Sequence, residues 1–516
     1  MPTAASRREG TTVTSAGFSV HDLNQALLVG ALVLLLSVFA VRLSVRSGLP
    51  SLLVYLAIGV AIGEAGLGIR FDSAELTQVL GYSALILILA EGGLTTSWPG
   101  IRASVAPAAV LSSLGVVVSV LVVGVGARLV LGVSWTVALL VGAVLSSTDA
   151  AAVFSVLRRV PLPSRITGLL EAESGFNDAP VVILVTALAG QAASRGGAQQ
   201  QWWQLLGMAT VELLGGAAIG LGVGYAGGLA LRRVASSSGL FSIGVVALTV
   251  LAYAGGALAH TSGFLATYLC ALLLGNLRLP HRHAVRGFAQ SLGWLAQIGL
   301  FVLLGLLASP SRLLGELWHA LPIGTVLLLV ARPLAVVASM TPFGVSWRDQ
   351  VFLSWAGLRG AVPVVLATVP LTLGTLGVRW LFDLVFVLVV IFTLVQGPTL
   401  PWMARRLGVT DADHATDLDV ESTPLAELHA DVLQMSIGPS SRLHGVEVFE
   451  LRLPPGAHVT MVIRDGQGFV PSPNTVLRHG DSMLIVATAQ ARTAAERRVR
   501  AISRRGRLAG WQASGP

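Results

Sequence analysis

The chain has 516 residues, of which 54% are hydrophobic and 12% are charged, and its mean hydropathy is +0.76. Soluble domains carry about twice that charged fraction, so the composition excludes an ordinary soluble protein. The net charge of +8 would suit a nucleic-acid-binding protein, but the basic residues, all of them arginine, lie mostly in short loops between apolar runs. That distribution is typical of the cytoplasmic face of a membrane protein, and we expect no nucleic-acid partner.

Thirteen apolar runs are long enough to cross a bilayer, which takes roughly 20 residues of helix. They follow a polar N-terminal tail, residues 1–23, and the first run lacks the small-residue cleavage site of a signal peptide. We therefore predict an all-α polytopic membrane domain over residues 24–405. The runs lie near residues 24–42, 48–66, 76–93, 103–130, 134–157, 164–192, 203–231, 238–257, 260–278, 286–308, 317–340, 348–372 and 378–404.

The arginines are unevenly divided between the two sets of loops. Loops after the odd-numbered runs carry most of them, including the pairs Arg158-Arg159, Arg232-Arg233 and Arg405-Arg406. Because cytoplasmic loops carry the excess of basic residues, this asymmetry predicts an external N-terminus and a cytoplasmic C-terminus in the cell's inner membrane.

The composition changes abruptly after the last run. Residues 406–428 are acidic and polar, and we expect them to form a linker. Residues 429–490 contain short β-type runs and the hairpin signal Asp465-Gly466, which predict a small α+β cytoplasmic domain. Residues 491–516 are rich in arginine and are expected to be a separate basic helix and tail, which could touch anionic lipid.

Carboxylates inside the apolar runs carry the main functional signal. Thr148-Asp149 lies in the fifth run, and the sixth run contains Glu173, Ser174, Asn177 and Asp178. Charges at membrane depth are costly, so they normally face the protein interior or a water-filled path and mark routes for ions or protons. The alternative interpretation is a buried structural pair of Asp149 and Asp178.

Helix-breaking residues interrupt two of the runs at informative places. Ser146-Ser147-Thr148 precedes Asp149 in the fifth run, and Gly357 and Gly360 flank Arg359 in the twelfth. Paired breaks of this kind indicate crossed, partly unwound helices at the binding site of a transporter built from inverted repeats. The unwound carbonyls can coordinate a cation, while Asp149 and Arg359 would compensate the partial charges of the facing helix ends.

The side chains near these breaks suit a monovalent cation. Ser174 and Asp178 are four residues apart and share a helix face, so both offer hard oxygen ligands on one side of the helix. No histidine or cysteine spacing indicates a transition metal. Burial disfavours the charged form of a carboxylate, so a proton and an alkali cation can compete for it.

Three motifs together resemble the cation–proton antiporters, in their electroneutral NhaP-like branch. They are the T-D at residues 148–149, the E-S-x-x-N-D at 173–178 and the G-L-R-G-A at 357–361. The resemblance implies a homodimer whose protomers each have a dimerisation domain and a mobile core, working by elevator-like alternating access. It implies a secondary active transporter and not an enzyme.

Residue roles follow from that resemblance position by position. Asp178 would be the essential carboxylate for proton and cation, with Asp149, Ser174 and the Thr148 carbonyl as further ligands. Glu91, at the end of the third run, resembles a third acidic contributor, although a residue at a span end can also snorkel to water.

Two polar neighbours have supporting roles in the same resemblance. Asn177 holds the place of a second aspartate in the electrogenic branch, which implies exchange of one cation for one proton. Glu173 is expected to pair with Arg332 or Arg359, in a role that is structural more than transporting. Arg359 could equally be a purely structural compensator of the helix ends. Asp383, at the start of the last run, is interpreted as a solvated helix-start residue.

The C-terminal segment resembles the regulatory domain of potassium channels and potassium antiporters (RCK-C or TrkA-C). The similarity lies in the R-D-G hairpin at residues 464–466 and the G-D at 480–481, before the last strand. No G-x-G-x-x-G unit precedes it, which puts control by NAD in doubt and leaves another nucleotide open as the regulatory ligand; no other cofactor is expected. The combination of this domain with an NhaP-like core makes potassium the first choice of cation.

Three other functions remain open at this point. A sodium/proton antiporter of the same fold would use the same oxygen ligands. A gated potassium channel could carry the same regulatory domain, although the chain has no T-V-G-Y-G filter loop. A membrane sensor built on an antiporter scaffold would transport nothing.

Overall fold

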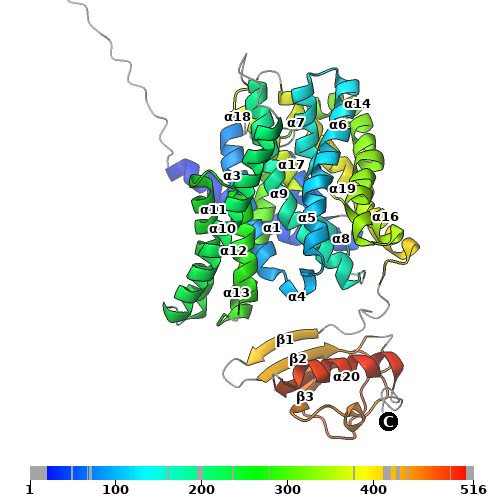
Figure 1. Ribbon diagram of the computed structural model, residues 1–516. Helices are drawn as coiled ribbons and strands as arrows, with labels where there is room; N and C mark the ends of the chain where they lie inside the picture. The colour runs from blue at the N-terminus through cyan, green and yellow to red at the C-terminus, as the bar shows by residue number, and fades with distance from the viewer. Residues whose placement is uncertain are drawn as a thin grey trace, which may run out of the picture.

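The computed structural model describes residues 20–47, 50–64, 66, 68, 73–157, 160, 162–193, 202–234, 237–277, 279–375, 378–410, 420–425, 430–438, 441–488 and 490–506. The expected tail up to residue 19 and the last residues from 507 onward lie outside this set. Figure 1 shows a helical body joined to a small sheet-containing domain at the C-terminal end of the chain.

Every predicted apolar run contains a helix. In the described part of the chain, eight helices are long and apolar enough to cross a membrane, and five shorter apolar helices occupy the remaining runs. The polytopic all-α prediction is therefore confirmed. The unbroken spans are α1 (Val20–Ser47), α2 (Ser51–Ile62), α3 (Ala74–Thr95), α9 (Ser164–Ala193), α10 (Trp202–Val234), α11 (Ser238–Leu258), α12 (Gly263–Asn276), α13 (Arg282–Leu307) and α19 (Arg379–Leu407).

Two spans are broken near their middles and cross there. The fifth consists of α7 (Trp135–Ser146) and α8 (Ala150–Leu157), and the twelfth of α16 (Trp347–Trp355), α17 (Ala361–Leu366) and α18 (Val369–Thr372). The backbone N–H of Asp149 donates to the Leu358 carbonyl at 2.9 Å, which joins the two breaks. In Figure 1 α7 lies above α8, whereas α16 lies below α17, so the broken spans run in opposite directions, as inverted repeats require.

Two further spans contain wide π-helical turns. One consists of α5 (Val105–Val110), η1 (Leu111–Gly115) and α6 (Val116–Leu131); the other of α14 (Pro310–Val326), η2 (Leu327–Ala331), α15 (Arg332–Met340) and η3 (Thr341–Phe343). Short π-turns inside α-helices are frequent at functional sites. Here η2 ends immediately before Arg332, and Ser112 in η1 donates a hydrogen bond of 3.2 Å to the Glu173 carbonyl.

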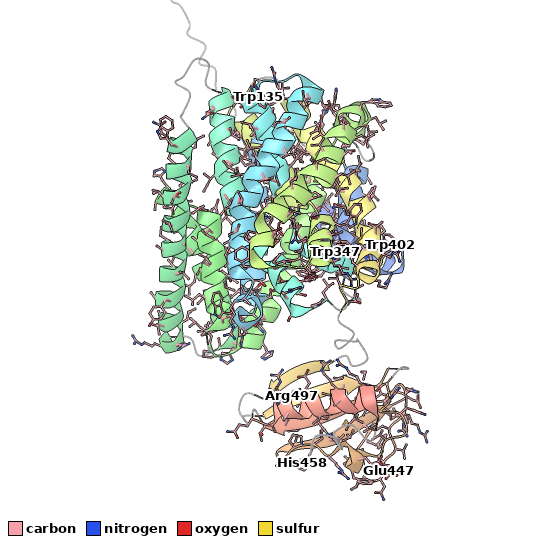
Figure 2. The ribbon with its side chains drawn as sticks, turned by 45° about the vertical axis from the view of Figure 1, so that its right-hand side comes forward. Trp135, Trp347, Trp402, Glu447, His458 and Arg497 are labelled. Carbon is pink, nitrogen blue, oxygen red and sulfur yellow. The ribbon has the colours of Figure 1, made fainter. Side chains whose placement is uncertain are left out.

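The two ends of the body are distinguished by the elements that they carry. We call the end with α4 (Trp98–Ile101) the lower end and the end with α18 the upper end, as drawn in Figure 1. Figure 2 shows Trp135 near the upper end and Trp347 and Trp402 toward the lower end, and all three are more than half exposed. Tryptophan gathers at both membrane–water interfaces, so these side chains fit the two edges of a bilayer.

The C-terminal domain is a five-stranded antiparallel sheet covered by one helix. The strands are β1 (Val420–Leu425), β2 (Ala430–Ser436), β3 (Ala457–Arg464), β4 (Gln467–Phe469) and β5 (Ser482–Thr488), in the order β1-β2-β5-β3-β4, with η5 (Val448–Leu451) between β2 and β3. Asp465 and Gly466 form the two-residue turn of the β3–β4 hairpin, both with positive φ, as their sequence indicates.

The helix α20 (Arg492–Arg505) belongs to this domain and is not a separate basic tail. Ala495, Val499 and Ile502 recur at helical spacing and are fully buried in the same apolar core as Leu433 and Ile485 of the sheet. The arginines mask that face in the sequence because they dominate the composition. The structure also places β1 inside the segment expected to be a linker.

Candidate cation site

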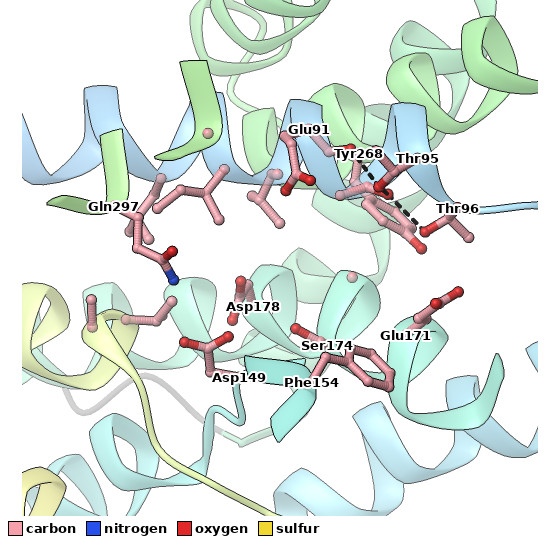
Figure 3. A pocket seen from close by; sticks show the side chains of 18 of the residues that line it. Glu91, Thr95, Thr96, Asp149, Phe154, Glu171, Ser174, Asp178, Tyr268 and Gln297 are labelled. Carbon is pink, nitrogen blue, oxygen red and sulfur yellow. Dashed lines mark hydrogen bonds between the residues drawn. The ribbon is translucent and has the colours of Figure 1, made fainter. Parts of the chain in front are cut away.

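A cavity of about 380 Å³ lies beside the crossing of the broken spans, between α3, α9, α12 and α13 (Figure 3). Five of the six residues predicted to bind the ion or the proton line it. They are Glu91, Thr148, Asp149, Ser174 and Asp178. The two acidic clusters of the sequence therefore face one space.

Asp178 lies in the middle of α9 and is almost completely buried, with 6% of its surface exposed. Ser147, in the break between α7 and α8, donates a hydrogen bond of 2.8 Å to Asp178 Oδ1. A buried carboxylate needs such donors, because an isolated charge is costly to remove from water. The unwound segment between α7 and α8 thus places a hydroxyl donor against the Asp178 carboxylate.

Asp149 has a structural contact in addition to its place in the cavity wall. The N–H of Ala152 donates to Asp149 Oδ1 at 3.3 Å, so the carboxylate caps the N-terminus of α8. A Cβ atom built at Gly360 would overlap Asp149 Oδ2. Glycine at 360 is therefore what allows this carboxylate to lie against the second break.

Behind the cavity wall, Thr148 is held by two α9 side chains. Its Oγ1 donates to Glu173 Oε1 at 3.1 Å and accepts a hydrogen bond of 2.6 Å from Asn177 Nδ2. Asn177 Nδ2 also lies 3.4 Å from the Thr148 carbonyl oxygen. Asn177 is not among the residues that line the cavity, so it lies behind the cavity wall in contact with Thr148, and its predicted role at the ion stays a prediction.

Glu173 pairs with Arg332, one of the two arginines expected as its partner. The contact is bidentate, at 2.5 and 2.9 Å, and both side chains are buried. Arg359 is 2% exposed, donates to the Gly357 carbonyl at 3.2 Å and interacts electrostatically with Arg332 and Glu173. These charges lie behind the wall and leave the cavity side of α9 to Ser174 and Asp178.

The lining of the cavity is strongly electronegative. Four carboxylates line it, those of Glu91, Asp149, Glu171 and Asp178, while no arginine or histidine is found among the described lining residues. On the opposite wall α13 contributes Gln290, Trp294 and Gln297, and Figure 3 shows Gln297 pointing toward the aspartates. Carboxylate, hydroxyl and amide oxygens are the ligands that hard cations prefer.

Sequence reasoning missed Ser147, Glu171 and Tyr268 as site residues. Glu171 could have been found, because it precedes Ser174 by three residues and Asp178 by seven, and these spacings place all three on one helix face. Ser147 gave no periodic signal, since it lies in an unwound segment. Tyr268 of α12 reaches the cavity from a helix that contains no charged residue.

The interpretation of Asp383 as a solvated residue was wrong. Asp383 is 4% exposed and accepts a hydrogen bond of 3.1 Å from Arg312 Nε. Arg312 comes from the first turn of α14 and lies across the start of α19, so an arginine distant in sequence compensates the buried charge.

Comparisons with known proteins agree with this arrangement. A family model described as the transmembrane sodium/hydrogen exchanger matches residues 30–406, and a TrkA-C domain model matches residues 432–500. The chain is 37% identical over 476 residues to the K(+)/H(+) antiporter NhaP of Alkalimonas amylolytica, which covers 90% of this chain and 82% of that protein. It is 35% identical over 474 residues to the K(+)/H(+) antiporter NhaP2 of Shewanella oneidensis, covering 90% and 81%.

A solved structure shows the same fold. The sodium proton antiporter MjNhaP1 from Methanocaldococcus jannaschii at pH 8 superimposes with a TM-score of 0.66 at 20% identity, over 75% of this chain and 99% of that one. The antiporter core and the TrkA-C domain account for most of the described residues. The chain belongs to the sodium/hydrogen exchanger family.

Proposed function

We propose that the protein is a secondary active antiporter that exchanges one potassium ion for one proton. The observation that carries the proposal is Asp178, a carboxylate buried at the crossing of two broken spans and facing a cavity whose lining is otherwise acidic or neutral. The potassium assignment is supported by the relatives named K(+)/H(+) antiporters, which match 90% of this chain. Sodium is the alternative cation, because the same oxygen ligands bind it.

Exchange follows from competition for one carboxylate. A potassium ion bound by Asp178, with oxygens of Asp149, Ser174 and Thr148 nearby, displaces the proton, and a proton displaces the ion in the next half-cycle. Among the described residues that line the cavity at this level of α9, Asp178 is the only carboxylate, so a single α9 group changes charge. One positive charge therefore moves in each direction, and the cycle is electroneutral.

The cavity indicates which face the site is open to. Its lining uses the last turns of α3 up to Thr96, the first half of α9 and the part of α13 that begins at Gln290, and these segments start from the lower end. The loops at the lower end carry the excess of arginine, so we assign the lower end to the cytoplasm and the N-terminus to the outside. We also assign the protein to the inner membrane. Alternating access would then move the crossed spans toward the upper end, in an elevator-like manner, within a homodimer.

Exchange in liposomes tests the proposal. Purified protein in liposomes that hold a pH gradient should dissipate the gradient when potassium is added, and sodium run in parallel decides between the two cations. Asp178→Asn should abolish the exchange, while Glu75→Gln, which changes an exposed carboxylate at the upper end of α3, should not. Normal exchange by Asp178→Asn would show that the site is elsewhere.

Electrical recordings distinguish electroneutral exchange from conduction by a gated potassium channel. On a solid-supported membrane, proton movement without net current is the expected result for one-for-one exchange. Single-channel currents would favour a gated potassium channel, and no cation-dependent proton flux under any condition would favour a sensor.

We also propose that the TrkA-C domain regulates the exchange of cation for proton. Comparison of the full chain with one ending before residue 411 should show a change in the pH or ligand dependence of exchange. Candidate nucleotides added to the full chain should reproduce that change if a nucleotide is the regulatory ligand.

A further inference from the structure

Glu171 is a carboxylate of the cavity to which neither the motifs of the sequence nor the proposed cycle gives a role. It lies on the face of α9 that also carries Ser174 and Asp178, and it lines the same cavity. Seven residues of α-helix separate it from Asp178, which corresponds to a rise of about 10 Å. Glu171 is therefore too far from Asp178 to share its ion, yet both carboxylates line the same cavity.

The carboxylate of Glu171 has no protein partner in the part of the chain that the structure describes. No hydrogen bond or ion pair to it is found there, although the side chain is only partly exposed. A structural buried acid is normally paired, as Glu173 is with Arg332 and Asp383 with Arg312. An unpaired acid that faces a cavity is the arrangement of a group that binds something mobile.

Tyr268 is a second unpaired group at the same place. Its side chain is 2% exposed and lines the cavity, and its buried hydroxyl faces the Thr96 side chain without forming a hydrogen bond of normal geometry to any described residue. It interacts electrostatically with Glu171, so the two groups are neighbours. Buried tyrosine hydroxyls usually find a partner. A cation or its hydration water would supply one here.

The packing of Tyr268 fixes where its hydroxyl points. Its ring lies over Gly175, where an added Cβ atom would overlap the ring, and its edge meets Phe176 with ring centroids 5.7 Å apart. Figure 3 shows Tyr268, Thr96 and Glu171 gathered at one end of the cavity, with Asp149 and Asp178 further along. This end is nearest the last turn of α3 and the start of α9, so it is the lower mouth.

We propose that Glu171 and the Tyr268 hydroxyl form an outer site for a partly hydrated monovalent cation at the lower mouth of the cavity. The ion is held there before it moves about 10 Å inward to Asp178. This inference rests on the proposed antiport function. A fixed negative charge at the mouth raises the local cation concentration and the rate of capture.

Transport kinetics of the full chain in liposomes test the outer site. Glu171→Gln should raise the KM for potassium about tenfold, while the maximal rate changes by less than about twofold. Glu171→Asp should keep most of the affinity, and Tyr268→Phe, which removes only the hydroxyl, should raise KM by a smaller factor. Glu75→Gln is the matched control, because it removes the same charge from an exposed position at the upper end.

Sidedness and ionic strength distinguish capture from a structural role. The rise in KM should occur only when potassium is supplied at the face that carries the TrkA-C domain, and added choline chloride should raise the wild-type KM toward the Glu171→Gln value. An unchanged KM, or an equal rise from both faces, would overturn the outer site. A wild-type protein that exchanges no cation would instead overturn the proposed function.

Discussion

Gly360 lies directly against the carboxylate of Asp149, so that a Cβ atom at position 360 would occupy the place of Asp149 Oδ2. The two residues come from different broken spans, and their close approach brings the two breaks together beside the cavity. Gly360 has no positive φ that would require glycine on conformational grounds. Glycine is required at position 360 only because a larger side chain would collide with the Asp149 carboxylate.

Gly360→Ala should therefore damage transport without unfolding the protein. The added methyl group must push the Asp149 side chain or the break aside, and a displacement of about 1 Å can cost about 100-fold in a positioned site. We expect cation-dependent proton flux to fall by at least about tenfold on that basis. Gly299→Ala is the control, because an added Cβ there meets nothing within 4 Å. Equal flux in the two variants would contradict the role of this contact.

The Glu173–Arg332 pair should behave as a stabilising unit. Removal of one partner leaves the other charge buried, so Glu173→Gln or Arg332→Met should each lower the free energy of unfolding by about 3–5 kcal/mol. The double variant should lose less than the sum of the two, since it leaves no unpaired charge. Thermal unfolding in detergent measures all three. Glu316→Gln, at the more exposed pair with His319, should change little.

Asn177→Asp should cost stability and leave the stoichiometry unchanged. The Asn177 amide donates to Thr148 Oγ1 and lies behind the cavity wall. An ionised aspartate cannot donate there and would add a negative charge near Glu173, at a cost of about 2–3 kcal/mol. The checks are a lower unfolding temperature and continued exchange without net current. A net current with a stable protein would show that residue 177 reaches the ion after all.

The folding stability of the TrkA-C domain should depend on Asp481, and this contribution should change with pH. Burial raises the pKa of Asp481, but the hydrogen bonds from Arg464 and from the Arg478 backbone, with the charges of both arginines, outweigh it and hold the pKa below its ordinary value. The resulting stability is present above the unfolded pKa, about 3.9, and is lost as pH falls through the lower folded value.

Pepsin digestion of the full chain measures this dependence. At pH 5 the wild-type domain should resist cleavage while Asp481→Asn, which loses about 2 kcal/mol, should not. The two should converge only when the pH falls below the folded pKa of Asp481, which lies below its ordinary value. Asp465→Asn, in the β3–β4 turn, is the control and should resemble the wild type at every pH. A constant difference across this range would exclude the linkage.

The sequence predicted the parts of the molecule that hydropathy and helix breaking control. Thirteen spans, the paired breaks and the carboxylates at 149 and 178 all follow from patterns that are local in the chain. The contacts across the breaks do not, because unwound residues such as Ser147 have no helical period that would fix their direction. The environment of Asp383 could not be predicted either, because its partner Arg312 is 71 residues away in the chain. The orientation of Asn177 could not be predicted because it depends on Thr148 of another span.

The bond between the Asp149 amide and the Leu358 carbonyl has a further consequence, because both of its atoms belong to the main chain. No side-chain replacement other than proline at 149 removes it. Side chains around the site can therefore diverge, and ion preference can drift between relatives, while the junction that positions them is inherited intact. Cation selectivity in such a protein can evolve faster than its architecture.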